Sequence, residues 1–469
     1  MSEASENAAG AGAEMTLHPR PTGGAPRPWA FPAPERGALP NGLTVLRADR
    51  PGQRVIAVEI NLTAPLDTEP RGLEGVATIM ARGLSEGTDR HTAEEFAAEL
   101  ERCGATLDTF ADHVGVRVSL EVPASRLAGA LRLVADALRA PAFPEHEIER
   151  LVANRLDEIP HELANPGRRA AMTLYATLFP EDSRLSRPRQ GTAESVRGID
   201  AKAVRDFYAA HLRPAAATAV VVGDLTGIDL DAILKETLGA WTGPAAEPVR
   251  WAPVEVRDTP RVVIVHRPDA VQTQLLIARV GPDRHDPVWP AHRLGVYCLG
   301  GTLTSRLDKV LREEKGYTYG IRASSTVLRS SAAGDGFSLL GIRGSVATDV
   351  TGPALADLWR VLRTLAAEGL TDEERDAAVQ FLVGVAPLSF ETASAVAGAL
   401  ADQVEEELPD DYQAALYARL AETGTVEATA AVVRAFPPDG LVTVLVGDAK
   451  RIADPVRELG IGEVEVVGA

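Results

Sequence analysis

The chain repeats one pattern in its two halves, and this repeat limits the folds that it can adopt. Three kinds of segment recur in the same order, namely a helix that ends at a glycine before a strand, a pair of helices joined by a turn, and a short apolar strand. The helix and strand around a glycine are LERCGATLDTF at 100–110 and LREEKGYTYGI at 311–321. The helix pairs are the segments 125–158 and 353–383. The short apolar strands are VVVGD at 220–224 and VLVGD at 444–448. Because each copy mixes helical with strand-like patterns, the repeat predicts an α+β protein of two homologous domains.

The composition divides the 469 residues into four parts. We predict a disordered N-terminal tail over residues 1–35, where Ala, Gly, Pro and Glu dominate. An N-terminal domain over 36–238 and a C-terminal domain over 261–469 follow from the repeat, since one core rarely holds so long a chain. Between them, the stretch 239–260 is rich in proline and glycine and is interpreted as a linker.

The charge and composition exclude several classes of protein. The formal net charge is −18, from 48 basic and 66 acidic residues, which argues against a nucleic-acid-binding protein. No apolar run is long enough to span a membrane, and the N-terminus lacks the pattern of a secretory signal. Cys103 and Cys298 both have apolar neighbours, so we expect free thiols, although a disulfide between them stays open. We therefore expect a cytoplasmic protein, and the preference for Arg over Lys is typical of a GC-rich bacterial genome.

The stretch LTSRLDKVLREEKGYTYGIR at 303–322 predicts a helix followed by a strand. Its apolar residues recur at helical spacing and should share one face, namely Leu303, Leu307, Val310 and Leu311. Gly316 is the expected end of the helix. In the strand that follows, Tyr317, Tyr319 and Ile321 should point to one side.

Arg312 and Tyr319 are the candidate functional residues of this stretch. The expected turn at Gly316 could bring a guanidinium and a phenol to one point, and both groups can donate hydrogen bonds to a carbonyl or an oxyanion. From the residues alone, we favour the simpler interpretation of a buried helix face with a solvated arginine and a packed tyrosine.

Four segments give the chain a resemblance to the insulinase (pitrilysin-like) metallopeptidase family, and to its smaller bacterial processing-peptidase branch. They are LPNGLTV at 39–45, GLEGVATIMARGLSEGT at 72–88, the stretch 188–224 that ends in VVVGD, and SRLDKVLREEKGYTYGI at 305–321. The resemblance implies two homologous domains, each a mainly antiparallel β-sheet packed with helices. Such a pair of domains would form half of a clamshell chamber.

Family peptidases carry a His-x-x-Glu-His motif shortly before a Gly-Thr pair, and this chain lacks it. Counting back from Gly87 places the motif at 78–82, where the sequence is Thr-Ile-Met-Ala-Arg. Thr78 is a poor zinc ligand, Ala81 cannot act as a base, and Arg82 would repel the metal. Glu158 stands where the family has its third ligand, but we favour a solvated helix carboxylate there. No two of the nine histidines lie three or four residues apart, so we expect no metal in this chain.

The resemblance assigns roles to residues of the second domain. Family peptidases use an arginine and a tyrosine, seven residues apart, to hold the substrate backbone and stabilise the oxyanion, and Arg312 and Tyr319 match that pair. Related non-catalytic subunits carry a glycine-rich loop that contacts substrate, which suggests Gly300 and Gly301 as further substrate-binding residues. A tight turn is the alternative explanation of these two glycines.

The resemblance therefore implies a subunit that lacks zinc and works within a heterodimeric metallopeptidase. A sister chain with an intact His-x-x-Glu-His motif would supply the zinc, and this chain would orient the peptide substrate with Arg312 and Tyr319. On this interpretation the chain is inactive alone and contributes to peptide processing by the pair. The alternative is an inert scaffold or assembly protein of the same fold.

Overall fold

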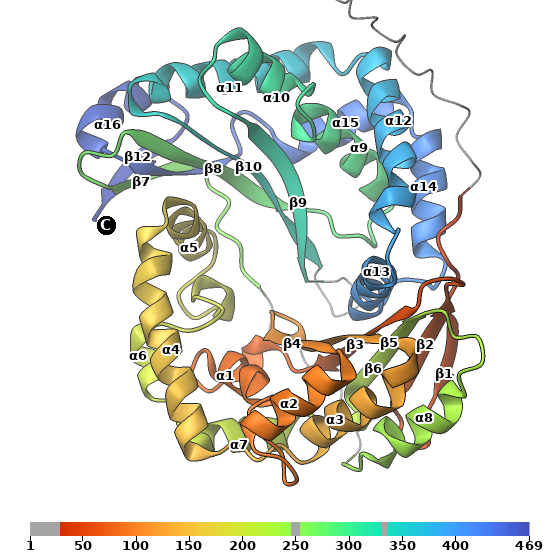
Figure 1. The fold of residues 1–469 in the computed structure, drawn as a ribbon. Helices are drawn as coiled ribbons and strands as arrows, with labels where there is room; N and C mark the ends of the chain where they lie inside the picture. Colours follow the sequence, from red (N-terminus) through yellow and green to blue (C-terminus); the bar gives the residue numbers. More distant parts are fainter. Residues whose placement is uncertain (1–28, 245–253, 330–335, 469) are drawn as a thin grey trace, which may run out of the picture. The chain divides into compact units, whose positions relative to one another are not determined.

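Two six-stranded sheets form the framework of the chain, and helices cover them (Figure 1). The computed structural model describes residues 29–244, 254–329 and 336–468. The first sheet has the strand order β1-β2-β6-β3-β5-β4, and the second has the order β12-β7-β11-β8-β10-β9. Most neighbouring strands are antiparallel; the parallel pairs are β2 with β6, and β7 with both β11 and β12. The predicted α+β class and the mainly antiparallel sheets are thus confirmed.

The strands of the first sheet lie in the first half of the chain, and those of the second sheet in the second half. The first sheet consists of β1 (Glu35–Ala38), β2 (Thr44–Asp49), β3 (Val55–Thr63), β4 (Thr106–Ala111), β5 (Gly115–Pro123) and β6 (Ala217–Gly223). The second consists of β7 (Arg261–His266), β8 (Gln272–Gly281), β9 (Ile321–Arg329), β10 (Phe337–Ala347), β11 (Val442–Gly447) and β12 (Glu463–Val467).

Helices connect the strands in both halves. Those of the first half are α1 (Val76–Gly83), α2 (Ala93–Cys103), α3 (Leu127–Arg139), α4 (Glu145–Ala164), α5 (Pro166–Leu178), α6 (Ala193–Arg197), α7 (Ala201–His211) and α8 (Leu230–Glu236). Those of the second half are α9 (Trp289–Gly300), α10 (Arg306–Asp308), the π-helical η6 (Lys309–Glu314), α11 (Thr351–Glu368), α12 (Asp372–Ser389), α13 (Ala393–Glu405), α14 (Tyr412–Glu422), α15 (Thr425–Ala435) and α16 (Ala449–Glu458).

The internal repeat seen in the sequence is a repeat of topology. In both sheets the central strands follow the same order, so β2, β6, β3, β5 and β4 correspond to β7, β11, β8, β10 and β9. The helix before β4 and the helical segment before β9 both end at a glycine in the left-handed region, Gly104 at φ +63° and Gly316 at φ +65°. A residue with a Cβ adopts this conformation only at a cost, which explains a glycine at both positions.

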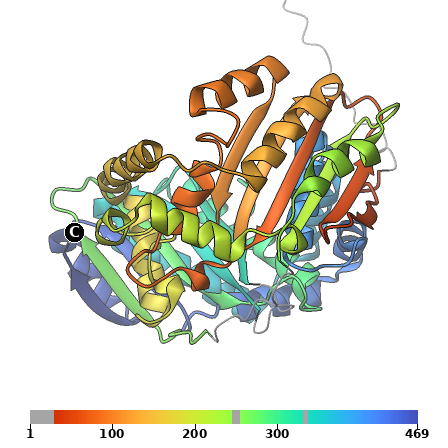
Figure 2. The ribbon, with the colours of Figure 1, turned by 90° about the horizontal axis from the view of Figure 1, so that it is seen from below.

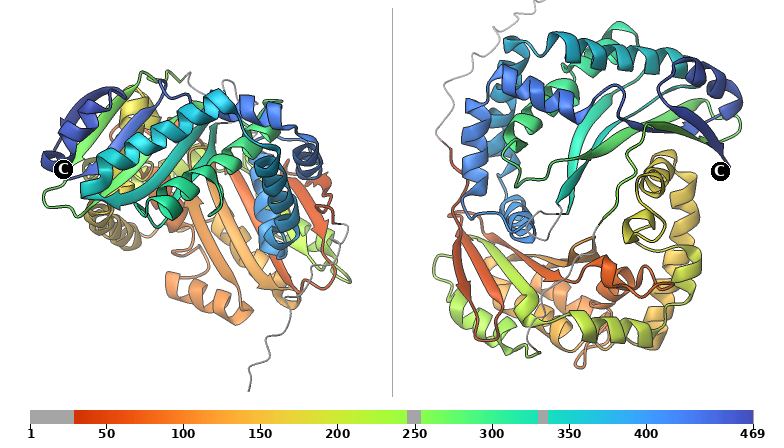
Figure 3. Two further views of the ribbon diagram at one scale, coloured as in Figure 1. Left: turned by 90° about the horizontal axis from the view of Figure 1, so that it is seen from above. Right: turned by 180° about the vertical axis from the view of Figure 1, so that it is seen from behind.

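The strands β6, β7 and β11 are mostly apolar on both faces because helices cover both faces of the two sheets. In the first sheet, α3 and α8 lie on one face and α13 lies on the other (Figures 1 and 2). In the second sheet, α11 lies on one face and α5 on the other (Figure 3). Val262 and Ile264 of β7 belong to the core shared with α9 and α11, and Val263 and Val265 belong to the core shared with α5. Alternate residues of a strand point to opposite faces, so VVVGD and VLVGD have no polar side.

Each half of the chain contributes one helix to the sheet of the other half. The helix α5 packs against β8 and β11 of the second sheet, and α13 packs against β3 and β6 of the first. Asn61 on β3 donates a hydrogen bond of 2.7 Å to the carbonyl of Ala401 on α13. Arg117 on β5 forms ion pairs with Asp402 at 2.8 Å and Glu405 at 2.7 Å. Residues 31–469 accordingly form one compact unit.

The stretch 303–322 differs from the prediction at both ends. Leu307 and Leu311 are fully buried as expected, but Leu303 is about half exposed, and the helix begins only at Arg306. The helical segment continues as π-helix through Glu314 and ends before Gly316. The strand β9 begins at Ile321, so Tyr317 and Tyr319 lie in the preceding loop and not in a strand.

The predicted N-terminal tail and the predicted linker lie partly outside the residues that the structure describes. The predicted tail lies outside the described residues up to position 28, and so do residues 245–253 of the predicted linker. Trp241, within that linker, is buried in the core of the first half.

Among the described residues, no single helix has the length and apolarity to cross a membrane. The pair α12 and α13, bent by 113°, meets that criterion jointly, on length and composition alone.

Candidate functional site

The five positions at which the family has its zinc motif lie on α1. The helix is buried almost throughout, since Thr78, Ile79, Met80 and Ala81 are all nearly inaccessible to solvent. Only Arg82 in this set is partly exposed, with 28% of its side chain accessible. The five motif positions therefore form a buried helix, but their side chains are not those of a zinc site.

Arg82 forms a two-pronged ion pair with Glu158 on α4. Its Nη1 atom donates to Oε1 of Glu158 at 2.9 Å, and its Nη2 atom donates to Oε2 at 3.1 Å. Arg155, one turn earlier on α4 and almost fully buried, donates a third hydrogen bond to Glu158 Oε2 at 3.0 Å. Arg155 also binds Glu162 at 2.7 Å, so that a chain of alternating charges runs along α4.

The charge of Glu158 is fixed by these two arginines. Partial burial would by itself raise the pKa of this carboxyl, but the hydrogen bonds and charges of Arg82 and Arg155 hold the pKa below its usual range. Glu158 is a helix carboxylate with 41% of its side chain exposed, but the sequence interpretation of a solvated residue missed its bonds to both arginines.

The geometry explains why these residues do not fit a zinc ion. Arg82 stands at the position of a zinc-binding histidine and places a permanent cation against Glu158, the position of the third ligand. Thr78, at the position of the other histidine, has a buried hydroxyl without a hydrogen-bond partner among the described residues. No group of three or more His, Cys, Asp or Glu side chains in the described parts of the chain could hold a metal ion.

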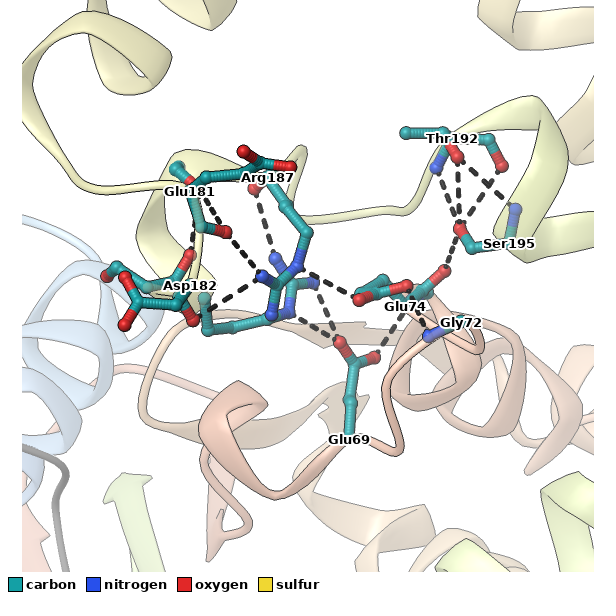
Figure 4. Close-up of polar contacts among 12 residues, drawn as sticks. Glu69, Gly72, Glu74, Glu181, Asp182, Arg187, Thr192 and Ser195 are labelled. Atoms are coloured by element: carbon teal, nitrogen blue, oxygen red, sulfur yellow. Dashed lines mark hydrogen bonds and ion pairs between the residues drawn. The ribbon is translucent and has the colours of Figure 1, made fainter.

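The N-terminal end of α1 is held by a buried polar network (Figure 4). Glu69 accepts hydrogen bonds of 3.0 Å from the backbone N–H groups of Gly75 and Ala77, and so caps the helix. Arg184 donates to the same carboxylate at 2.8 Å, and both side chains are almost completely buried. Arg187 lies 2.9 Å from Glu74. Ser195 Oγ also donates to the carbonyl of Glu74 at 2.8 Å, and this bond joins two of the segments that carry the family resemblance, 72–88 and 188–224.

The loop that carries Tyr319 is attached at both of its ends. At its start, the backbone N–H of Tyr317 donates to the carbonyl of Leu311 at 2.9 Å, and the ring of Tyr317 packs against the second core. At its end, the N–H of Ile321 donates to Oδ1 of Asp308 at 3.0 Å.

Asp308 is the anchor of this loop, a role that the sequence analysis did not predict. Its carboxylate is fully buried and also forms an ion pair with Arg322. It therefore joins the turn before η6 to the start of β9. An acid next to Leu307 in a helix normally suggests a solvated residue, so only the contact with a residue 13 positions away reveals its role.

Arg312 and Tyr319 both lie in this anchored segment. Tyr319 is 96% exposed, and its hydroxyl has no hydrogen-bond partner among the described residues. Arg312 lies on η6 with one third of its side chain exposed, and its nearest carboxylate is that of Glu313, 3.6 Å away. No hydrogen bond joins the two described side chains. Both donors are thus available to another molecule, and their role in binding substrate stays a prediction.

Gly300 and Gly301 lie where α9 ends. A Cβ on Gly300 would come within 2.4 Å of the backbone nitrogen of Ala323, so this glycine allows α9 to approach β9 closely. A Cβ on Gly301 would lie 2.4 Å from the ring of Tyr297. Close packing therefore accounts for both glycines, and contact with substrate is not needed to explain them.

Sequence comparisons identify the family. Residues 45–192 match the profile described as "Insulinase (Peptidase family M16)", and residues 198–382 match "Peptidase M16 inactive domain". Together these matches cover most of the described chain, and the chain belongs to the insulinase, or peptidase M16, family.

Relatives and solved structures agree with this assignment. The chain is 26% identical to an uncharacterized zinc protease of Streptomyces coelicolor over 77% of this chain and 78% of the relative. It is 23% identical to a non-peptidase homolog of Helicobacter pylori, over 68% and 72% of the two chains. The crystal structure of a peptidase M16 inactive domain from Pseudomonas fluorescens has the same fold, with a TM-score of 0.79 and 24% identity over 88% of this chain and 97% of that chain.

The motif positions on α1 decide where this chain stands within its family. The expected zinc ligands are replaced by Thr78 and Arg82, and the expected catalytic glutamate by Ala81. The chain is therefore a member of the M16 family that lacks the residues of the His-x-x-Glu-His motif.

Proposed function

We propose that this chain is the subunit without zinc in a two-chain M16 peptidase, and that it binds and orients a peptide substrate with Arg312 and Tyr319. The observation that carries the proposal is the contrast between the metal position and the loop with Tyr319. At the metal position, Arg82 and Glu158 satisfy one another through two hydrogen bonds. On the anchored loop, Tyr319 is left almost fully exposed.

In this role the chain's own residues would position the substrate and stabilise developing charge. The guanidinium of Arg312 presents planar N–H donors suited to a peptide carbonyl, and the Tyr319 hydroxyl can donate to the oxygen that becomes negative during hydrolysis. Anchoring by Asp308 and Tyr317 fixes the loop before substrate arrives, which limits the entropy lost on binding. A sister chain with an intact His-x-x-Glu-His motif would hold the zinc that activates water.

Production of this chain with an M16 sister chain that carries the intact motif tests the proposal. Cleavage of a fluorogenic peptide library should be strong for the pair and negligible for this chain alone. Tyr319→Phe in the pair should lower the rate sharply while the two chains still associate.

A second candidate is an inert assembly protein, and the similarity to a relative named as a non-peptidase homolog favours it. On this account the pair would form, but cleavage would not depend on Arg312 or Tyr319. The same experiment separates the two candidates, because only the first makes the rate depend on these side chains.

A further inference from the structure

The second half of the chain contains a cavity of about 410 Å³ that neither the metal position nor the Tyr319 loop accounts for. It is lined by residues of α9, β9, α13 and α14, and α9 lies beside both β9 and α14 (Figure 1). The volume falls within the range of pockets that hold small organic ligands. All of its lining residues belong to the described part of the chain.

Aromatic side chains form much of the wall of this cavity. Trp289 and Tyr297 contribute from α9, Phe390 from the turn between α12 and α13, and Tyr412 and Tyr417 from α14. Such walls offer flat apolar surface against which an aromatic ring can stack.

The charges around the cavity are balanced except at Arg293. The lining carboxylate, Asp402, is paired with Arg117 at 2.8 Å, and the lining Arg284 lies 3.3 Å from Glu406. Arg293 has no hydrogen-bond or ion-pair partner among the described residues, and its guanidinium lies 5.6 Å from the centre of the Tyr417 ring. One cation of the wall is therefore left without a counter-charge.

Other polar groups of the wall are neutral. Ser325 on β9 contacts Nε2 of His292 at 2.7 Å, and burial lowers the pKa of His292 to about 4, so this imidazole is uncharged at neutral pH. The hydroxyls of Tyr297 and Tyr412 are fully buried without hydrogen-bond partners in the described structure, and burial raises the pKa of each to about 12. They therefore remain protonated at neutral pH and add no charge to the wall.

We infer that this cavity binds a small aromatic carboxylic acid, whose ring packs against the aromatic wall and whose carboxylate pairs with Arg293. A guanidinium stacked on an aromatic ring is prearranged for a planar carboxylate, and partial burial strengthens the pairing. A neutral aromatic molecule would gain the packing but not the charge pairing. The site is separate from the peptide-binding role proposed for Arg312 and Tyr319, because neither residue lines the cavity.

Isothermal titration calorimetry on the full chain tests the inference, with 3-phenylpropionate as the probe and 3-phenylpropionamide as its uncharged counterpart. We expect saturable one-to-one binding of the acid and binding of the amide weaker by about tenfold or more, since a hydrogen bond to a charged group is lost. Absence of acid binding up to about 10 mM, or equal affinities for acid and amide, would overturn the inference.

Three variants locate the binding site. Arg293→Gln should reduce the affinity for the acid by about tenfold and leave that for the amide unchanged. Ala399→Leu, which fills part of the cavity while keeping its charges, should weaken both probes. Arg363→Gln, on the exposed face of α11 and away from the cavity, should change neither. An undiminished affinity for the acid in folded Arg293→Gln and Ala399→Leu proteins would place the binding elsewhere and contradict the inference.

Discussion

At the level of single residues, hydrogen bonding distinguishes the metal position from the Tyr319 loop. Arg82 and Glu158 use their hydrogen-bonding atoms on each other, so no ligand is needed to complete them. Tyr319 uses none of its polar capacity within the described chain, yet the loop that carries it is firmly attached. Binding residues often lie on loops that a rigid scaffold positions, and an exposed tyrosine on an anchored loop fits such a role.

Tyr319→Phe removes one hydroxyl and keeps the ring. If this hydroxyl stabilises developing negative charge, the variant should lower kcat of the reconstituted pair by about a hundred- to a thousandfold. Tyr317→Phe is the matched control, because that tyrosine lies in the same loop but packs against the core, and its activity should stay near that of the wild type. Peptide cleavage assays beside thermal melts make the comparison. Equal activity of the two variants would remove Tyr319 from the mechanism.

Asp308→Asn should destabilise the chain and loosen the loop. The amide can still accept a hydrogen bond from the Ile321 N–H, but it leaves Arg322 without its charged partner, and we expect a loss of about 2 kcal/mol in the free energy of unfolding. Asp349→Asn provides the control, since the pair of Asp349 with Arg451 is solvent-exposed and should contribute less than about 1 kcal/mol. Urea denaturation measures both. Similar losses in the two variants would mean that Asp308 is no anchor.

At the level of elements, α1 and α4 bring two of the expected ligand positions together, but the side chains at these positions do not suit zinc. The side chain of position 82 meets that of position 158 across the two helices. The helix is buried and capped by Glu69, so its place does not depend on a metal. The geometry should therefore accept zinc ligands if they are put back.

Metal analysis tests this directly. The wild-type chain, purified without chelators, should hold no stoichiometric zinc. The variant with Thr78→His, Ala81→Glu and Arg82→His should bind about one zinc per chain, and the further change Glu158→Gln should weaken that binding strongly. Zinc in the wild type, or zinc in the variant that does not depend on Glu158, would contradict the assignment of these positions.

The sequence was sufficient to predict much of the fold, because the repeat and the family segments are local patterns. The left-handed glycines Gly104 and Gly316, and the two-sided apolar strands β6 and β11, could all be read from short stretches. Contacts between distant residues could not. The start of β9 depends on Asp308, which accepts the N–H of Ile321, and periodicity alone placed Tyr319 in a strand.

The site was predictable only in part for the same reason. Sequence reasoning identified both Arg82 and Glu158 but did not pair them. Their opposite charges, at two positions that the family brings to one metal, were the available signal. Arg312 and Tyr319 were proposed from their spacing, and the structure places them on one anchored segment without joining them.

The helix α13 makes hydrogen bonds and ion pairs with the first sheet. Arg117→Ala would leave Glu405 and Asp402 without the cation that lies between the sheet and this helix, and we expect a loss of about 3 kcal/mol in stability. Arg36→Ala is the matched control, because Arg36 also pairs across the two halves, with Asp410, but both members of that pair are exposed. Its loss should stay below about 1 kcal/mol. Denaturant unfolding that shows no difference between the variants would count against this account of α13.

At the level of the whole molecule, residues 31–469 form one unit in which α5 and α13 are exchanged between the halves. In this unit Arg82 and Glu158 pair at the metal position, and the loop before β9 exposes Tyr319. A sister chain with an intact His-x-x-Glu-His motif would complete it. The association should appear as a one-to-one species in sedimentation of the mixed chains.

Peptide cleavage by the separate and combined chains is the most direct test of the proposed shared site. The account predicts negligible cleavage by this chain alone, weak or no cleavage by the zinc-bearing sister alone, and strong cleavage by the one-to-one pair that is lost in Tyr319→Phe and Arg312→Ala. Full activity of the sister alone, or full activity of the pair with both substitutions in this chain, would contradict it.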